Sequence, residues 1–296
     1  MLAGDLALAA ALAALVAARF SLPIGAALAI ALALSVLLPG ALVAASFLIA
    51  ALLAPGDAGG LRSTLRALLT EAIALEAAAL TMALRADSLP APHGAADAGA
   101  AKPARPLLLI HGVVCNCSIW RAWLRPLRTA GFAPVRALNL EPLFADLEIH
   151  AARVAQELRA LQREANGARV SIVAHSMGGL VARSALRLLG PETVSRIVTI
   201  ATPHHGTRVA RFFAWLLPMR QMVPGSAWLQ AINTVPARPL ATPLTSIYSL
   251  EDNLVVPPRS ARLEAAEARE LRGLGHLALL GSRRAIAQTL AALAQA

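Results

Sequence analysis

The hydrophobic positions along the chain fall into two regimes. Residues 6–54 are almost entirely apolar, and Arg19 is the only charged residue among them. After residue 106, short apolar runs alternate with stretches in which apolar residues recur at helical spacing. Between the two regimes, residues 90–106 are rich in proline, glycine and alanine and have no periodicity, which is typical of a linker. We therefore expect an apolar N-terminal region and a separate C-terminal domain.

The apolar N-terminal region predicts membrane segments. A helix needs about 20 apolar residues to cross a bilayer, and a cleavable signal is disfavoured because apolar sequence resumes after Pro23. We expect residues 1–56 to hold two transmembrane helices, one near residues 2–20 and one within residues 24–53; three short spans or one kinked span are alternatives. The arginines that follow favour a cytoplasmic C-terminal domain, so we expect a multi-pass protein of the cell inner membrane.

Residues 57–89 predict an amphipathic helical region. Leucines and isoleucines recur there at helical spacing, and Glu71 and Glu76 lie in its middle. A helix of this kind either lies on a membrane surface or packs against the C-terminal domain. The pattern leaves both arrangements open.

Residues 107–296 predict an α/β domain. Apolar runs predict strands at residues 107–110, 135–140, 170–173, 196–200, 244–250 and 270–272, and periodic stretches predict helices at residues 120–130, 149–165, 180–189 and 283–296. Strands that alternate with helices form a mostly parallel sheet with helices on both faces. An apolar insertion broken by prolines, at about residues 208–239, indicates a cap; an ordinary core helix is the alternative.

Composition narrows the classes of function. Hydrophobic residues make up 57% of the chain and charged residues 15%, and the formal net charge of +10 is carried almost wholly by arginine. No basic run is interleaved with aromatic residues, so a nucleic-acid partner is disfavoured. Cys115 and Cys117 are too close for a mutual disulfide, and a zinc site would need a second pair of ligands.

The strongest chemical signal is Ala174-His175-Ser176-Met177-Gly178-Gly179, which lies between a predicted strand and a predicted helix. A nucleophile elbow holds its serine on a sharp turn in this context, with small residues two before and two after it. Ala174 and Gly178 occupy those places, although glycine is usual at the first. The motif predicts Ser176 as a nucleophile; a helix-capping turn is the alternative.

A serine nucleophile needs a base, and the base needs an orienting carboxylate. In this kind of fold the acid follows the serine along the chain, and the histidine comes last. Asp252 follows the strand at residues 244–250 and is the candidate acid, with Glu251 as the alternative. His276 lies in a glycine-containing loop after the last predicted strand and is the candidate base.

The tetrahedral intermediate of acyl transfer needs two backbone N–H donors. Met177, the residue after the nucleophile, is expected to supply one of them. Val113, in the loop after the first strand, is expected to supply the other. In this prediction Gly112 allows the loop to turn, and His111 shapes it and does not act as a base.

Taken together, these motifs resemble the bacterial lipase and esterase branch of the α/β-hydrolase superfamily. That branch has a His-Gly oxyanion loop, a His-Ser-x-Gly-Gly elbow and a Thr-Pro-His-x-Gly segment, which correspond here to residues 110–112, 174–179 and 201–207. The resemblance covers roughly residues 107–280. It implies an α/β-hydrolase fold, ester hydrolysis through an acyl-enzyme, and no metal or organic cofactor. It also implies that His175, Gly178 and His204 shape the site.

We therefore expect a membrane-anchored serine esterase or lipase that acts on acyl esters or lipids and contacts the bilayer. A thioesterase, amidase or acyltransferase would use the same residues, and a non-catalytic membrane-bound binding module is a further alternative. A metal site built from His111, His175, His204 and His205 is disfavoured because no carboxylate or cysteine lies near them in sequence. The sequence leaves open the acyl chain, the alcohol and the oligomeric state.

Overall fold

A six-stranded parallel sheet forms the centre of the computed structural model, which describes residues 23–57, 59–84, 104–189, 192–234, 242–264 and 266–295. The order of the strands is β2-β1-β3-β4-β5-β6, and each neighbouring pair is parallel. The strands are β1 (Leu107–Ile110), β2 (Val135–Leu138), β3 (Val170–His175), β4 (Val194–Ile200), β5 (Leu244–Ser249) and β6 (Glu267–Leu271). The expected α/β fold with a parallel sheet is confirmed.

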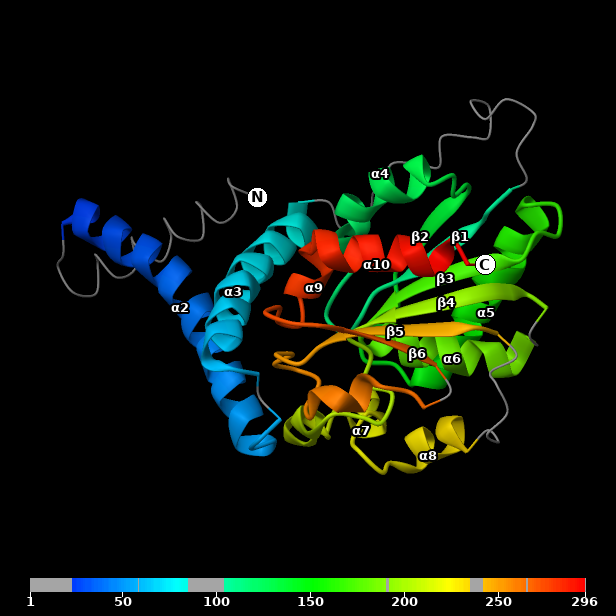
Figure 1. The fold of residues 1–296 in the computed structure, drawn as a ribbon. Helices are drawn as coiled ribbons and strands as arrows, with labels where there is room; N and C mark the ends of the chain where they lie inside the picture. Colours follow the sequence, from blue (N-terminus) through cyan, green and yellow to red (C-terminus); the bar gives the residue numbers. More distant parts are fainter. Residues whose placement is uncertain are drawn as a thin grey trace.

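Helices cover both faces of the sheet (Figure 1). One face carries α5 (Leu147–Glu164) and α6 (Met177–Leu189), and the other carries α4 (Arg121–Thr129) and α10 (Arg283–Leu293), with the short elements η2 (Cys117–Trp120) and α9 (Ala278–Gly281) beside them. Local sequence signals set the helix ends. The Asp146 side chain accepts a hydrogen bond from Glu148 N and so caps the start of α5, and Gly167 follows its end with a positive φ.

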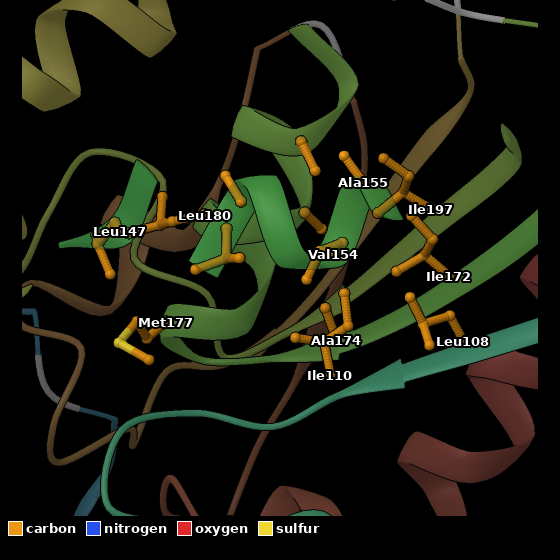
Figure 2. Close-up of a cluster of buried hydrophobic side chains, with 14 of the residues drawn as sticks. Leu108, Ile110, Leu147, Val154, Ala155, Ile172, Ala174, Met177, Leu180 and Ile197 are labelled. Carbon is orange, nitrogen blue, oxygen red and sulfur yellow. The ribbon is translucent and has the colours of Figure 1, made fainter. Parts of the chain in front are cut away.

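The alternation of side chains along each strand divides the core into two clusters. In β1, Leu108 and Ile110 belong to the cluster under α5 and α6, while Leu107 and Leu109 belong to the cluster under α4 and α10. Figure 2 shows the first cluster, in which strand residues such as Ile172 face Val154 and Leu180 from the helices. A sheet that is buried on both faces explains why its central strands read as continuous apolar runs.

The insertion between β4 and β5 forms three short helical elements, η3 (Arg208–Phe213), α7 (Leu217–Gln221) and α8 (Ala227–Asn233), and its residues 235–241 lie outside the described part of the chain. Its side chains divide between two environments. Met222, Leu229 and Ile232 are buried in the cluster under α5 and α6, whereas Phe212 and Trp215 are exposed. The insertion thus contributes to the core and also presents apolar side chains at the surface.

The N-terminal helices α2 (Ile24–Leu53) and α3 (Leu61–Leu84) pack against each other and against the α/β domain (Figure 1). Helix α3 contacts α9 and η2, and α2 contacts η3. Of the two arrangements left open for residues 57–89, the structure has the described part of this region packed on the domain. Residues 85–103, which include most of the expected linker, lie outside the described residues.

The expected membrane spans are not supported. No helix within the described ranges meets the combination of length and hydropathy required of a bilayer-crossing segment. The first expected span, near residues 2–20, lies outside those ranges. The second falls in α2. One face of its C-terminal half packs against protein, where Val43 is buried and Ser46 Oγ accepts a hydrogen bond of 2.8 Å from Asn253 Nδ2, whereas Leu42, Leu48 and Leu52 are exposed. The described part of the chain therefore gives no support to the prediction of a multi-pass inner-membrane protein.

Candidate active site

The parallel sheet brings the predicted site residues to one edge. Because all six strands run in the same direction, the loops that follow β1, β3, β5 and β6 leave the sheet on the same side, where open α/β sheets bind ligands. These loops carry His111, Ser176, Asp252 and His276 respectively. Strand register aligns them further, since Ile110 pairs with Ala174, and His175 pairs with Ile200.

Ser176 sits on a sharp turn between β3 and α6. Its φ is 54°, in the left-handed region that non-glycine residues seldom adopt. Two hydrogen bonds hold it there: Ser176 N donates to Ile200 O at 2.9 Å, and Thr202 Oγ1 donates to Ser176 O at 2.9 Å. The structure thus has the strand, sharp turn and helix that the elbow motif predicts.

Glycines at the elbow permit an approach that a side chain would block. A Cβ atom at Gly178 would lie 2.5 Å from His111 O and 2.8 Å from Ile110 O, both on the backbone at the end of β1. A Cβ atom at Gly112 would lie 2.8 Å from Ser176 Cβ. These distances are shorter than van der Waals contact, so both positions require glycine for α6 and the loop after β1 to meet at Ser176.

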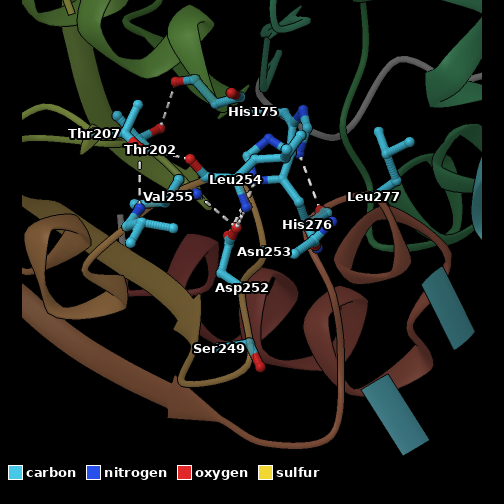
Figure 3. A network of polar contacts seen from close by, with 12 residues as sticks. His175, Thr202, Thr207, Ser249, Asp252, Asn253, Leu254, Val255, His276 and Leu277 are labelled. Atoms are coloured by element: carbon cyan, nitrogen blue, oxygen red, sulfur yellow. Dashed lines mark hydrogen bonds and ion pairs between the residues drawn. The ribbon is translucent and has the colours of Figure 1, made fainter. Parts of the chain in front are cut away.

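Asp252 and His276 are in direct contact and both are buried (Figure 3). His276 Nδ1 lies 3.0 Å from each carboxylate oxygen of Asp252. Asp252 Oδ1 also accepts hydrogen bonds from Leu254 N at 2.9 Å and from Val255 N at 2.8 Å, which fix the carboxylate in its loop. Because an ionised carboxylate only accepts, Nδ1 carries the ring proton and Nε2 is left free to accept one.

Glu251, the alternative acid, points elsewhere. Its Oε2 accepts hydrogen bonds from Gly273 N at 2.7 Å and from Ser249 Oγ at 3.2 Å. These bonds connect the end of β5 to the end of β6. The structure therefore brings Asp252 to the ring of His276, and Glu251 to Gly273, just after β6.

The surroundings of His276 favour its charged form. Burial lowers the pKa of His276, but the negative charge of Asp252, the hydrogen bond to it and the charge of Glu71 outweigh that effect and leave the pKa above the ordinary value of 6.5. Together with the geometry, this marks His276 as a histidine whose proton affinity is set by specific carboxylates.

His111 and His175 are buried neutral rings that hold the loops around the site. His111 Nδ1 donates to Gly112 O at 2.7 Å, and its Nε2 accepts from Leu140 N at 3.0 Å, so the ring fixes the loop after β1. Burial lowers the pKa of His111 to about 4. His175 Nε2 donates to His276 O at 3.3 Å, and burial, followed by the charge of His276, lowers the pKa of His175 well below 6.5.

Both ring nitrogens of His204 have partners within the protein. Its Nε2 is 3.0 Å from Thr199 Oγ1, and its Nδ1 is 3.3 Å from a guanidinium nitrogen of Arg183. Burial and the charge of Arg183 lower the pKa of His204 well below 6.5. Within the described ranges, no three histidine, cysteine, aspartate or glutamate side chains converge as metal ligands do.

The two candidate oxyanion donors flank the serine. Met177 is the first residue of α6, where backbone N–H groups have no partner within the helix. Val113 follows the Gly112 turn and lines the same cavity as Ser176. The structure thus brings both residues next to the nucleophile position, on the loop and the helix where the sequence predicts them.

A cavity of about 320 Å³ opens beside Ser176 and His276. Apart from these two residues and Thr207, its lining is apolar and comes from the loops after β1, β2 and β4, the insertion and the acid loop. The lining residues are Val113, Val114, Phe144, Ser176, Pro203, Thr207, Val209, Phe213, Leu216, Met219, Met222, Leu254, Val255 and His276. Such a cavity suits an apolar group attached to a reacting carbon near Ser176.

Three residues with clear contacts at the site were missed by the sequence analysis as site residues. Asn253 Oδ1 accepts a hydrogen bond of 3.0 Å from His276 N. Thr207 Oγ1 donates to Leu254 O at 2.6 Å and accepts from Val256 N at 3.0 Å, so it supports the acid loop. Glu71 reaches the histidine loop from α3. Thr207 is the last residue of the segment at residues 201–207 that carries the Thr-Pro-His-x-Gly motif, which was a signal for it; Asn253 and Glu71 had no such signal.

Comparisons with known proteins assign the sequence to a family and relate the fold to solved structures. The family described as "Domain of unknown function (DUF7379)" matches residues 72–256. A search of curated proteins finds no match. The family match begins within α3 and includes β1 to β5.

Solved structures of similar fold include lipases. Aspergillus fumigatus lipase B is 21% identical with a TM-score of 0.59, over 70% of this chain and 55% of the fungal chain, so the match spans about half of that protein. Bacillus licheniformis lipase BlEst2 in mature form is 19% identical with a TM-score of 0.55, over 70% of this chain and 96% of that one. A Mycobacterium tuberculosis protein described as a non-heme bromoperoxidase is 17% identical with a TM-score of 0.51, over 65% and 92%. The likeness establishes the α/β-hydrolase fold.

Gly178→Ala tests the close approach at the elbow. We expect it to lower the free energy of unfolding by about 1–3 kcal/mol, because the added methyl group must displace the backbone at the end of β1. Gly281→Ala is the matched control, since a Cβ atom there has nothing within 4 Å. Denaturant unfolding measures both variants. Equal stabilities for the two variants would contradict the steric argument.

Proposed function

We propose that this chain, which belongs to the family described as "Domain of unknown function (DUF7379)", is a serine hydrolase that cleaves carboxylic esters with apolar acyl groups. The observation that carries the proposal is the contact of His276 Nδ1 with Asp252 at 3.0 Å, on the sheet edge where Ser176 occupies a strained elbow. Ser176 and His276 line one apolar cavity, so a nucleophile, a base and an acyl site meet at one place.

In the proposed mechanism, Ser176 Oγ attacks the ester carbonyl carbon while His276 Nε2 takes the hydroxyl proton. Asp252 holds the ring in the tautomer with the proton on Nδ1 and stabilises the imidazolium that forms. His276 then donates its proton to the leaving alcohol, and the acyl group remains on Ser176. Water attacks the acyl-enzyme with His276 as base, and the carboxylic acid leaves as Ser176 recovers its proton.

Charge on the carbonyl oxygen would be stabilised by the backbone N–H groups of Met177 and Val113. Met177 begins a helix of 13 residues, whose dipole adds to the effect. The ring of His111, bonded to Gly112 O, supports the loop that carries Val113. In the described structure no hydrogen bond joins Ser176 Oγ to His276; contacts of this kind often tighten only when substrate binds.

The other candidate reactions use the same residues. Attack on a thioester or an amide, or transfer of the acyl group to an acceptor other than water, needs the same nucleophile, base and oxyanion donors. The apolar cavity favours an acyl group without selecting among these leaving groups. A purely binding role is disfavoured because serine, histidine and carboxylate are all present at the site.

Chain-length dependence of ester hydrolysis tests the proposed substrate class. With p-nitrophenyl esters we expect kcat/KM to rise about fourfold for each methylene group that the cavity buries, because each contributes about 0.8 kcal/mol. Ser176→Ala should abolish turnover and leave the fold intact. Val209→Phe, which narrows the cavity, should lower kcat/KM for long acyl chains more than for acetate.

Three outcomes would count against the proposal. Turnover that survives in folded Ser176→Ala would exclude Ser176 as the nucleophile. A flat profile across chain lengths, unchanged in Val209→Phe, would exclude the cavity as the acyl site. Hydrolysis of the matching thioesters in preference to the esters would replace ester cleavage by thioester cleavage.

The pH dependence tests the roles of the two neighbouring carboxylates. A base must be neutral, so kcat/KM should fall as the pH drops through the pKa of His276, which lies above 6.5. Asp252→Asn removes the main charge that raises this pKa. We therefore expect the acid limb of the profile to move to lower pH and kcat to fall about 10⁴-fold.

Glu251→Gln is the matched control for Asp252→Asn, since it neutralises the adjacent buried carboxylate, which contacts Gly273 N and not the histidine ring. It should leave the acid limb near its wild-type position. If Glu251→Gln moved the limb and Asp252→Asn did not, Glu251 would be the acid.

A further inference from the structure

A carboxylate from the N-terminal helix α3 reaches the loop that carries His276. Glu71 is only 2% exposed. Its Oε1 accepts a hydrogen bond of 3.0 Å from Leu277 N, and its Oε2 accepts one of 2.8 Å from Ala278 N. These are the two residues that follow His276, so both carboxylate oxygens are committed to the turn directly after the candidate base.

The same carboxylate also contacts the residue before His276. A Cβ atom at Gly275 would lie 2.5 Å from Glu71 Oε2 and 2.8 Å from Glu71 Cβ. A side chain at residue 275 and the Glu71 carboxylate therefore exclude each other. Glu71 fills the space that Gly275 leaves, and the backbone on both sides of His276 rests against it.

Other side chains hold the backbone of His276 itself. Asn253 Oδ1 accepts from His276 N at 3.0 Å, and His175 Nε2 donates to His276 O at 3.3 Å. Asp252 fixes the ring. Glu71 binds the N–H groups of Leu277 and Ala278, so its removal would leave these two groups without their acceptor, while Asn253 and His175 still held the backbone of His276.

We propose that Glu71 is a positioning residue for His276. Through Glu71, helix α3 contributes to the geometry of the active site. The proposal rests on the proposed function for its effect on turnover. Buried carboxylates are costly unless specific donors satisfy them, and the donors here are the two N–H groups next to His276.

The charges that face His276 come from several elements. Asp252, in the acid loop, and Glu71, on α3, are the charged groups that act on His276. The neutral ring of His175, at the end of β3, lies with its centroid 4.7 Å from that of His276. Glu251 is turned toward Gly273 N, and Arg66 of α3 packs with its aliphatic carbons near Gly273. Burial raises the pKa of Glu71 above its ordinary value, and the bonds from Leu277 and Ala278 and the charge of His276 reduce this shift without reversing it. The charge of Glu71 adds to that of Asp252 in raising the pKa of His276.

The test compares Glu71→Gln and Glu71→Ala with Glu76→Gln in the full chain. Glu76 lies on the same helix and is exposed, so Glu76→Gln is a matched neutralisation away from the site. Two readouts are needed: kcat and KM with a p-nitrophenyl ester, and the pKa of His276 from NMR titration of histidine-labelled protein, with the signal assigned by its loss in His276→Asn.

We expect Glu71→Ala to lower kcat about 10²-fold with KM within about twofold of wild type, since a misplaced base affects the chemical step more than binding. Glu71→Gln keeps the shape and one acceptor, so it should lose about tenfold in kcat, and the pKa of His276 should fall. Glu76→Gln should change neither quantity. Partial rescue by glutamine relative to alanine would separate positioning from simple attachment of α3.

The proposal is overturned if Glu71→Gln matches Glu76→Gln in both kcat and the pKa of His276. If Glu71→Ala does not fold, Glu71→Gln alone decides. The titration needs no turnover, so the two proposals can fail separately. A wild-type protein that cleaves no ester, but whose His276 pKa falls only in Glu71→Gln, would contradict the hydrolase and support the positioning role.

Discussion

The site depends on the close approach of helix α6 to the end of strand β1. Gly178 makes this approach possible, since a methyl group there would lie 2.5 Å from His111 O. This approach affects both the nucleophile and the oxyanion donors. The approach brings the strained turn of Ser176 next to the Gly112 loop, where Val113 follows, and it directs the start of α6 at the same point. Parallel strand register then brings Asp252 and His276 to this edge.

The loop that carries His276 is held by side chains that are far from it in the sequence. Asn253 and Asp252 hold it from the acid loop, His175 holds it from the elbow, and Glu71 holds it from α3. Asn253 in turn donates to Ser46 on α2. Both N-terminal helices are thus connected by hydrogen bonds to the loops that carry the candidate acid and base. The geometry of the site therefore depends on how these helices pack on the domain, because a shift of α3 would move the turn after His276.

The pattern of apolar residues along the sequence predicted most strands of the sheet, but it could not predict contacts between residues far apart in the sequence. The strand at residues 107–110 was predicted with its observed bounds, because a run buried on both faces is apolar at every position. The last strand, Glu267–Leu271, was placed three residues late, since its exposed edge is polar. Chain order predicted an acid in the loop after β5 but did not separate Asp252, the assigned acid, from Glu251; the structure has Asp252 against the ring. Glu71 could not be found, because its partner Leu277 is 206 residues away. The apolar run of α2 predicted a membrane span, and in the structure one face of its C-terminal half packs on protein, where Val43 is buried.

The central claim is that Ser176 is a nucleophile activated by His276. Labelling of the full chain with a fluorophosphonate, followed by peptide mapping by mass spectrometry, tests it most directly because the reagent reports an activated serine whatever the natural substrate. The account predicts a single adduct on Ser176 that disappears in His276→Ala. An adduct on another serine, or no adduct on folded wild-type protein, would contradict it.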